Sequence, residues 1–343
     1  MNRRQFVQTA STAALMASAL PAFPGIFKSL AANRMGVAAA SYSIRRFSDP
    51  IEMMEHCHSL GFGGVQPGIK AWEKDYIKKV RKTAEKLGMF IEGQIRLPKE
   101  ESDLERFEKT LTTAKEVGAT ICRVACGGRR YEDFDQKESF TAFKKRSIRS
   151  LQLAEPLLKK HQIKVAVENH KDWRISDLLE IMKLLDSEWV GITLDTGNSM
   201  SLLEQPMTVV DSFAPYAYSV HLKDMAVNEY EDGFLLSEVT LGEGVLDLNK
   251  VISTIQRHNP SIKFNLEMIT RDPLKIPYLT DKYWATFDQI PGREVASFLS
   301  LVRKQKTDTL PYISDNTKER KIALEIENNN LCLEYGKQNL KFS

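Results

Sequence analysis

The chain has 343 residues, of which 42% are hydrophobic, and its 48 basic and 45 acidic residues leave a formal net charge of +3. This composition supports one large core, and the near balance of charge excludes the strong basic field of nucleic-acid-binding proteins. Four cysteines, at positions 57, 122, 126 and 332, lack the paired spacing of a zinc knuckle. A core of this size also needs no disulfide framework.

The N-terminus differs from the rest of the chain. Arg3 and Arg4 precede a weakly apolar stretch, rich in alanine, serine and leucine, that runs to Phe27. This pattern predicts an export signal over residues 1–32, and the arginine pair resembles a twin-arginine signal. Pro21 and Pro24 interrupt the apolar run before it reaches the roughly 20 residues that span a bilayer. We therefore expect cleavage, membrane contact only during export and a periplasmic mature protein.

From Gly36 the chain alternates short apolar runs with amphipathic segments, as in repeated βα units. Apolar residues recur at helical spacing from Leu104 to Ala114 and from Ile175 to Leu185, where Ser176 is a predicted N-cap. We predict one (β/α)8 TIM barrel over residues 35–306 and a C-terminal helical extension or packing arm over residues 307–343. The eight predicted strands are residues 36–43, 64–67, 90–97, 121–126, 164–170, 191–195, 217–223 and 262–268.

Two segments after the last two predicted strands are longer than the usual βα loop of roughly 2–6 residues. Met225–Asp247 is predicted to be a loop that turns at Gly242–Gly244 before a helix near Leu248. Ile269–Pro291 is predicted to be a second loop, rich in charged and aromatic residues. Because both loops follow strands that carry candidate site residues, we predict that they form lids or substrate walls.

Four predicted strands end in residues that bind hard divalent metals: Glu168, Asp195, His221 and Glu267. Successive side chains of a strand point to opposite faces, so each of these residues lies opposite the large apolar residues of its strand. In a parallel barrel the inward face converges at the carboxyl ends of the strands. An oxygen-rich set with one imidazole fits one manganese, magnesium, cobalt or zinc ion, and we favour manganese. The alternative is an unrelated scatter of capping or solvent-facing residues.

The same segments resemble the sugar phosphate isomerase/epimerase superfamily, whose members have a xylose isomerase-like barrel. In that family a glutamate, an aspartate, a histidine and a glutamate on strands 5 to 8 hold one divalent ion, and the glutamates also act as acid and base. The resemblance therefore implies that the four strand-end residues are metal ligands and that Glu168 and Glu267 are catalytic. It covers about residues 35–304 and rests on Val167–His170, Leu194–Asn198, His221–Asp224 and Leu266–Met268.

The resemblance implies that a proton is removed next to the carbonyl of a keto-sugar, through an enediolate. This intermediate leads to isomerisation, epimerisation or elimination. Asn198 stands where many epimerases of the family have a histidine, and Val227 stands where they have an arginine. These departures argue against a simple epimerase of free ketoses, and the predicted export adds weight to a lyase acting on 3-keto-glycosides. The lyase and the isomerase or epimerase interpretations then have about equal weight. Both interpretations therefore stay open.

Other residues on the inner face and in the loops are candidates for binding a small-molecule sugar or glycoside. They supply charges, hydrogen-bond donors and one aromatic surface, and their alternative roles are to orient the metal ligands or to pack the loops. The sequence leaves open whether the chain forms a homo-oligomer. The candidates are His170, Lys223, Asn198, Gln94, Arg123, Arg271 and Trp284.

Two other classes of protein fit part of the pattern. An apurinic endonuclease built on a related barrel needs a histidine-rich cluster of three zinc ions and a basic DNA-binding face. Only His170 and His221 are suitably placed for such a cluster, so we expect no nucleic-acid partner. A non-catalytic, exported sugar-binding barrel is the second alternative. Binding alone does not need carboxylates on both sides of a substrate, so Glu168 and Glu267 favour an enzyme.

Overall fold

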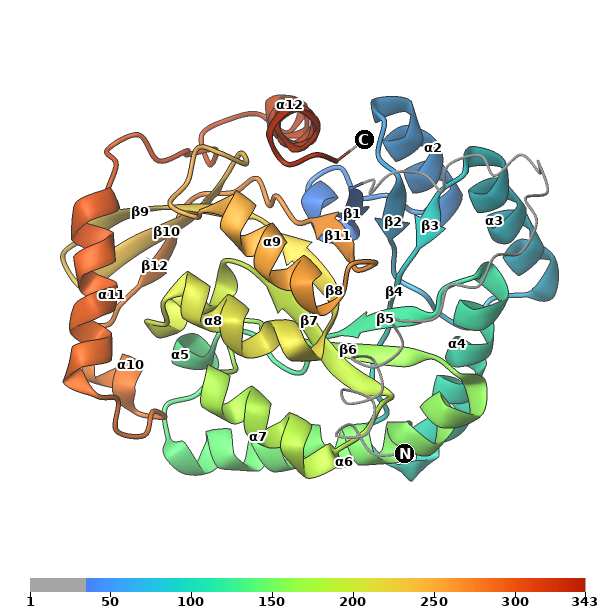
Figure 1. The fold of residues 1–343 in the computed structure, drawn as a ribbon, viewed down its shortest axis with the longest axis horizontal. Helices are drawn as coiled ribbons and strands as arrows, with labels where there is room; N and C mark the ends of the chain where they lie inside the picture. The colour runs from blue at the N-terminus through green and yellow to red at the C-terminus, as the bar shows by residue number, and fades with distance from the viewer. Residues whose placement is uncertain (1–34, 343) are drawn as a thin grey trace, which may run out of the picture. The chain divides into compact units, whose positions relative to one another are not determined.

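The computed structural model describes residues 35–342, and the predicted export signal lies outside them. Parallel strand segments follow one another in the order β3-β2-β1-β11-β8-β7-β6-β5-β4. Glu92 alone separates β3 from β4, so the two ends of this order are continuous and the sheet closes into a TIM barrel of eight positions (Figure 1). The barrel strands are β1 (Gly36–Ala38), β2 (Gly64–Gln66), β3 (Phe90–Ile91), β4 (Gly93–Gln94), β5 (Ile121–Val124), β6 (Lys164–Glu168), β7 (Val190–Asp195), β8 (Ala217–Leu222) and β11 (Lys263–Leu266). The predicted fold is confirmed.

Helices surround the barrel and cover the apolar outer face of its strands (Figure 1). The longer ones are α2 (Pro50–Leu60), α3 (Lys74–Leu87), α4 (Leu104–Val117), α6 (Lys137–His161), α7 (Ile175–Leu185), α8 (Pro206–Phe213), α9 (Leu248–His258), α11 (Gly292–Gln305) and α12 (Lys318–Asn339). Short helical turns are α5 (Arg130–Asp133), α10 (Asp281–Trp284), η1 (Ala39–Tyr42), η2 (Glu101–Asp103), η3 (Asn198–Leu202) and η4 (Ala214–Tyr216).

The predicted start of α7 is wrong. The N-cap is Arg174 rather than Ser176, and the Asp177 carboxylate accepts a hydrogen bond from the Arg174 backbone N–H at 3.3 Å. A carboxylate that bonds back to the N-cap fixes the start of a helix. The helix therefore begins two residues before the position that a Ser176 cap would give.

The segment predicted as a long loop after the seventh barrel strand is largely a β-hairpin. β9 (Asp224–Tyr230) and β10 (Gly233–Val239) pair antiparallel, and β12 (Leu274–Ile276) adds a third strand from the second predicted loop. Val227 and Phe234 are fully buried in this sheet, and α11 lies beside it (Figure 1). The loop prediction for Met225–Asp247 is therefore wrong, because the hairpin buries its own apolar side chains outside the barrel.

Apolar side chains pack on the outer face of the strands, and an aromatic ring fills part of the barrel interior. The outward residues of β6 and β7 are fully buried Val165, Val167, Ile192 and Leu194. At the amino end of the strands, the Phe90 ring fills the space beside Gly36 and Gly64, where an added Cβ would come within 2.5 Å of the ring. The four residues predicted to bind a metal lie toward the opposite, carboxyl end.

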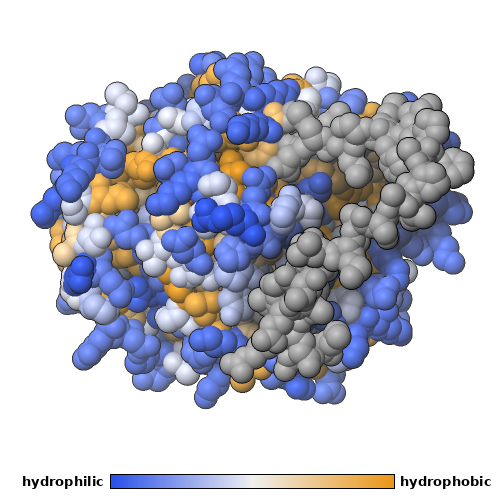
Figure 2. Space-filling view, viewed as in Figure 1, coloured by the Kyte–Doolittle hydropathy of each residue, from blue (hydrophilic) through white to orange (hydrophobic). Residues whose placement is uncertain are grey.

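Helix α12 packs on the first strand connection of the barrel. The buried Glu325 carboxylate accepts hydrogen bonds from the backbone N–H groups of Ile44 and Arg45, at 2.8 and 3.0 Å. Phe342 then packs against Phe264 of β11, with ring centroids 5.4 Å apart. Hydrophilic side chains cover most of the described surface in the view of Figure 2. Across residues 35–342, every helix is too short or too polar to span a bilayer.

Candidate metal centre

Four side chains converge at the carboxyl end of the barrel. Glu168 ends β6, Asp195 ends β7, His221 lies in β8, and Glu267 follows β11. One ligand atom from each of them lies within 4.8 Å of all the others, and all four residues are buried. The side-chain alternation that predicts a shared inner face therefore holds in the structure.

The imidazole of His221 is fixed in a form suited to binding a cation. Its Nε2–H donates to the side-chain oxygen of Gln66 at 2.7 Å. Its Nδ1 atom faces Glu267 Oε1 at 3.2 Å, Glu168 Oε1 at 3.6 Å and Asp195 Oδ2 at 3.9 Å. A hydrogen bond from one ring nitrogen sets the tautomer and leaves the other nitrogen free as a ligand.

The convergence of carboxylates changes the proton affinity of the imidazole. Burial lowers the pKa of His221, but the carboxylates of Glu267 and Glu168 outweigh burial and raise it to about 10. The three carboxylates thus stabilise the protonated, positively charged form of the His221 imidazole. A divalent ion at the same point supplies more positive charge and requires the neutral imidazole.

The donor set fits a divalent metal ion. Within the described residues, no hydrogen bond satisfies His221 Nδ1 or Asp195 Oδ2, although both atoms are buried. Their nearest charged neighbours are Lys223 Nζ, 3.0 Å from Asp195 Oδ2, and Glu267 Oε1, 3.2 Å from His221 Nδ1. A bound ion would give both atoms a direct ligand bond. Three carboxylates and one imidazole suit manganese, magnesium, cobalt or zinc better than a thiol-seeking metal. Glu168, Asp195, His221 and Glu267 would hold the ion.

Two cationic side chains hold the outer oxygens of the glutamates. Arg123 on β5 donates to Glu168 Oε2, with Nε at 2.5 Å. Lys223, just after β8, places Nζ 2.6 Å from Glu267 Oε2 and 3.0 Å from Asp195 Oδ2. Burial raises the pKa of Glu168, but Arg123 and His221 bring it below its usual range. Burial also raises the pKa of Glu267, and His221 and Lys223 lower it well below the usual range. Both glutamates are therefore ionised at neutral pH.

The turn after β7 fixes the third carboxylate. Asp195 Oδ1 accepts hydrogen bonds from the backbone N–H groups of Gly197 and Asn198, at 2.9 and 2.7 Å. This turn leads into η3 and places the Asn198 amide beside Glu168, where its Nδ2 donates to Glu168 Oε1 at 3.1 Å. The aspartate thus turns its other oxygen, Oδ2, toward the centre.

The remaining predicted substrate residues are distributed unevenly. Gln94 is paired in register with Arg123 on the neighbouring strand. His170 bonds to the Gly128 carbonyl at 2.9 Å, and burial, followed by Lys171, lowers its pKa to about 4, so its ring is neutral at pH 7.

Arg271 and Trp284 come from the segment after β11. Arg271 pairs with the buried Glu238 of β10. The Trp284 indole N–H bonds to the Tyr278 carbonyl at 2.6 Å, and its ring packs on Tyr283 and Phe287. The contacts of Trp284 thus lie in an aromatic cluster and not with the four ligands.

Three residues of the site escape the sequence analysis: Gln66, Lys171 and Glu238. Gln66 ends β2 on the inner face, so the rule that identifies the four ligands also applies to it. Lys171 lies in the loop after β6, and its Nζ donates to the Asn198 side-chain oxygen. Glu238 belongs to the hairpin that the sequence analysis interprets as a loop. No periodic pattern marks a buried charge in such segments.

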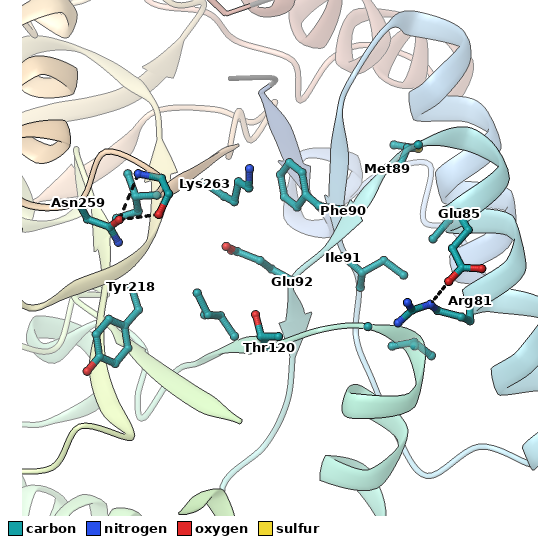
Figure 3. Close-up of a pocket in the computed structure, with 17 residues that line it drawn as sticks. Arg81, Glu85, Met89, Phe90, Ile91, Glu92, Thr120, Tyr218, Asn259 and Lys263 are labelled. Carbon is teal, nitrogen blue, oxygen red and sulfur yellow. Dashed lines mark hydrogen bonds and ion pairs between the residues drawn. The ribbon is translucent and has the colours of Figure 1, made fainter. Parts of the chain in front are cut away.

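A pocket of about 440 Å³ lies at the opposite, amino end of the strands (Figure 3). Its lining includes Phe90, Glu92 and Lys263. The Glu92 carboxylate is buried and accepts hydrogen bonds from neutral groups only: Ser219 at 2.5 Å, Asn265 at 2.7 Å and Gln66 at 3.5 Å. Among residues 35–342, the group of side chains that could hold a metal lies at the carboxyl end and not around this pocket.

Comparison with known proteins identifies relatives of the barrel. The sequence pattern of the xylose isomerase-like TIM barrels matches residues 54–285. A 3-oxo-isoapionate decarboxylase of Pectobacterium atrosepticum is 24% identical over 216 residues, which cover 61% of this chain and 74% of the relative.

Solved structures of sugar epimerases share the fold. A D-psicose 3-epimerase, solved in the presence of D-fructose, superposes with a TM-score of 0.58 at 13% identity. The match covers 88% of this chain and 98% of that chain. A 3-keto-D-glucoside 4-epimerase from E. coli gives a TM-score of 0.54 at 15% identity, over 79% of this chain and 99% of its own.

Proposed function

This chain belongs to the family of xylose isomerase-like TIM barrels, and on that premise we propose that it is a divalent-metal-dependent enzyme acting on keto-sugars. It removes a proton from the carbon next to the substrate carbonyl. The observation that carries this proposal is the convergence of four buried residues, Glu168, Asp195, His221 and Glu267, whose ligand atoms lie within 4.8 Å of one another.

The side chains divide the work of proton transfer. When bound, a divalent ion supplies Lewis acidity for the charge that develops on the substrate oxygen. Glu168 and Glu267 are ionised, and in our proposal one takes the proton from carbon while the other returns a proton from the opposite side. Arg123 and Lys223 hold the outer oxygen of each glutamate and so fix the direction of the carboxylates. Gln66 holds the imidazole of His221 in place.

The activities of the relatives support carbanion chemistry. Epimerisation at position 3 of a ketose and at position 4 of a 3-keto-glucoside both remove a proton next to a carbonyl. Decarboxylation of a 3-oxo acid leaves its electron pair next to a carbonyl as well. An enediolate or enolate is therefore common to these reactions. For this chain we keep isomerisation or epimerisation and elimination from a 3-keto-glycoside as the two outcomes of one intermediate.

The two outcomes differ in product mass. Elimination splits the substrate, whereas isomerisation and epimerisation leave its mass unchanged.

We propose that the protein acts after export, where glycosides are available, and that the N-terminal segment with Arg3 and Arg4 is its signal.

The test is incubation of the manganese-loaded protein in deuterated water with 3-keto-glycosides and, separately, with free ketoses. We expect solvent deuterium at the carbon next to the carbonyl in recovered substrate or isomerised product, measured by NMR and mass spectrometry, unless elimination outpaces return of the proton. A substrate deuterated at that carbon then shows a primary isotope effect. His221→Ala is the control, because it removes a metal ligand: elemental analysis should show stoichiometric metal in the wild type and loss in the variant. Absence of both exchange and cleavage across these substrates contradicts the proposal.

A further inference from the structure

Three cationic side chains stand beside the proposed metal centre. Lys171 and Lys223 are only 2% and 1% exposed, and both ammonium groups donate to one acceptor, the side-chain oxygen of Asn198, with Lys223 Nζ at 3.3 Å. Arg271 completes the group from the loop after β11, and 26% of its side chain is exposed. The three cations therefore run from the buried centre toward solvent.

Lys171 lacks the anion that a buried ammonium requires. Among the ion pairs formed by residues 35–342, none joins it to a carboxylate, and its hydrogen bond goes to the neutral amide of Asn198. Burial and the nearby charge of Lys223 lower the pKa of Lys171 to about 8, so it still carries its charge at neutral pH. A buried charge without an ionic partner destabilises the folded protein. A protein can retain such a charge where a bound ligand supplies the missing partner.

The charge balance of the whole site leads to the same conclusion. Four carboxylates, those of Glu168, Asp195, Glu267 and Glu238, face four cations, those of Arg123, Lys171, Lys223 and Arg271. While the ligands hold no ion, the protonated imidazole of His221 adds a fifth positive charge, so one positive charge is in excess. A divalent ion with a neutral imidazole then leaves two positive charges in excess. Proton transfer from the substrate to a glutamate moves one negative charge onto the substrate and leaves the total unchanged, so this excess remains for an anionic group of the substrate.

We propose that the substrate is anionic and carries a carboxylate, which Lys171, Lys223 and Arg271 bind beside the metal centre. The proposal rests on the proposed function and narrows its substrate class to keto-sugar acids. Without substrate, the Glu238 carboxylate partly neutralises two of these cations: it pairs with Arg271 and lies 3.9 Å from Lys223 Nζ. Arginine and lysine are the side chains that bind carboxylates most strongly.

The test compares two probes that differ by one group, D-gluconate and D-glucitol, by calorimetric titration of the manganese-loaded protein at pH 7. We expect gluconate to bind about tenfold to a hundredfold more tightly, as for a charge-assisted hydrogen bond. Lys171→Met should abolish the preference, because a methionine of similar length keeps the packing and removes the charge. Lys275→Met, which removes an exposed lysine of β12 nearby, is the matched control and should keep it.

A second variant separates ligand binding from a structural role. Glu238→Gln removes the carboxylate that competes for Arg271 and Lys223, so we expect a stronger preference for gluconate. A purely structural role of this cluster predicts a weaker one. Equal affinity of wild type for both probes overturns the proposal. So does a preference that Lys171→Met leaves intact, since the carboxylate then binds only the metal.

The outcomes also distinguish this inference from the proposed function. Deuterium exchange into neutral keto-sugars without a preference for gluconate leaves the proposed function standing and removes the carboxylate subsite. A gluconate preference that depends on Lys171, without exchange into any keto-sugar or keto-sugar acid, supports the subsite and removes the proposed reaction.

Discussion

At the carboxyl end of the barrel, buried carboxylates lie against arginine and lysine, whereas at the amino end the buried carboxylate of Glu92 accepts hydrogen bonds from neutral groups only. The consequences are opposite. Arg123 and His221 bring the pKa of Glu168 below its usual range against the effect of burial, while burial raises the pKa of Glu92 to about 7. The nature of the partners, and not depth in the barrel, therefore decides whether a buried acid stays ionised.

The two ionised glutamates at the carboxyl end are the proposed acid and base, so the largest expected effect on turnover comes from replacing them. Glu168→Gln or Glu267→Gln should lower turnover by about 10²–10⁴, the usual contribution of a positioned acid or base. Phe90→Leu at the amino end should keep turnover near the wild-type value. Steady-state kinetics give the measurement, and elemental analysis must accompany it because both glutamates are proposed ligands. Near-normal turnover by metal-replete glutamate variants contradicts the two-carboxylate mechanism.

At the amino end, the expected effect is on stability and depends on pH. The unfolded chain releases the Glu92 proton near its ordinary pKa of 4.5, whereas the folded protein keeps it up to about pH 7. Folding therefore loses stability as pH rises through this window, by about 3 kcal/mol. Glu92→Gln should remove this loss, because glutamine does not titrate. The unfolding free energy of the variant minus that of the wild type should therefore increase between pH 4.5 and pH 7. Urea denaturation at pH 5 and pH 8 measures the difference, and a constant difference contradicts it.

Gln66 connects the two ends, since it bonds to both His221 and Glu92. Gln66→Leu should weaken manganese affinity by about 10–100-fold, because the imidazole loses the partner that fixes its tautomer. Competition with a chelator gives the affinity. Gln94→Leu is the matched control, since this glutamine also ends a barrel strand, whereas the hydrogen bond of His221 Nε2 goes to Gln66. Equal affinities of the two variants would exclude an orienting role for Gln66.

The smallest effect concerns packing at the amino end. Phe90→Leu leaves a small void beside Gly36 and Gly64, and we expect it to cost about 1 kcal/mol, because the ring is only half-buried. Urea denaturation at a single pH measures this cost. Unchanged stability would show that the ring does not support the closure of the barrel.

The alternation of side chains predicts where the barrel strands lie and that the four strand-end residues converge, because both depend on which face a strand turns inward. It places the ends of the strands less well, since Ala39–Tyr42 forms a helical turn and the third strand ends at Gln94. It misses the sheet of β9, β10 and β12, since a hairpin outside the barrel and a loop can have similar composition. It also misses Lys171 and Glu238, whose positions depend on tertiary contacts between segments far apart in sequence. Gln66 is different, because its place at the end of a strand makes it predictable by the same rule.

The hairpin that carries Glu238 lies outside the barrel and contributes none of the four proposed ligands. The β12 segment and the loop with Arg271 also come after the last barrel strand. Mutation in these segments can therefore change the charge presented to a substrate while the ligand geometry stays constant. The part of the structure that sets this charge is thus separate from the strands that carry the proposed ligands, as is common where one barrel supports several activities.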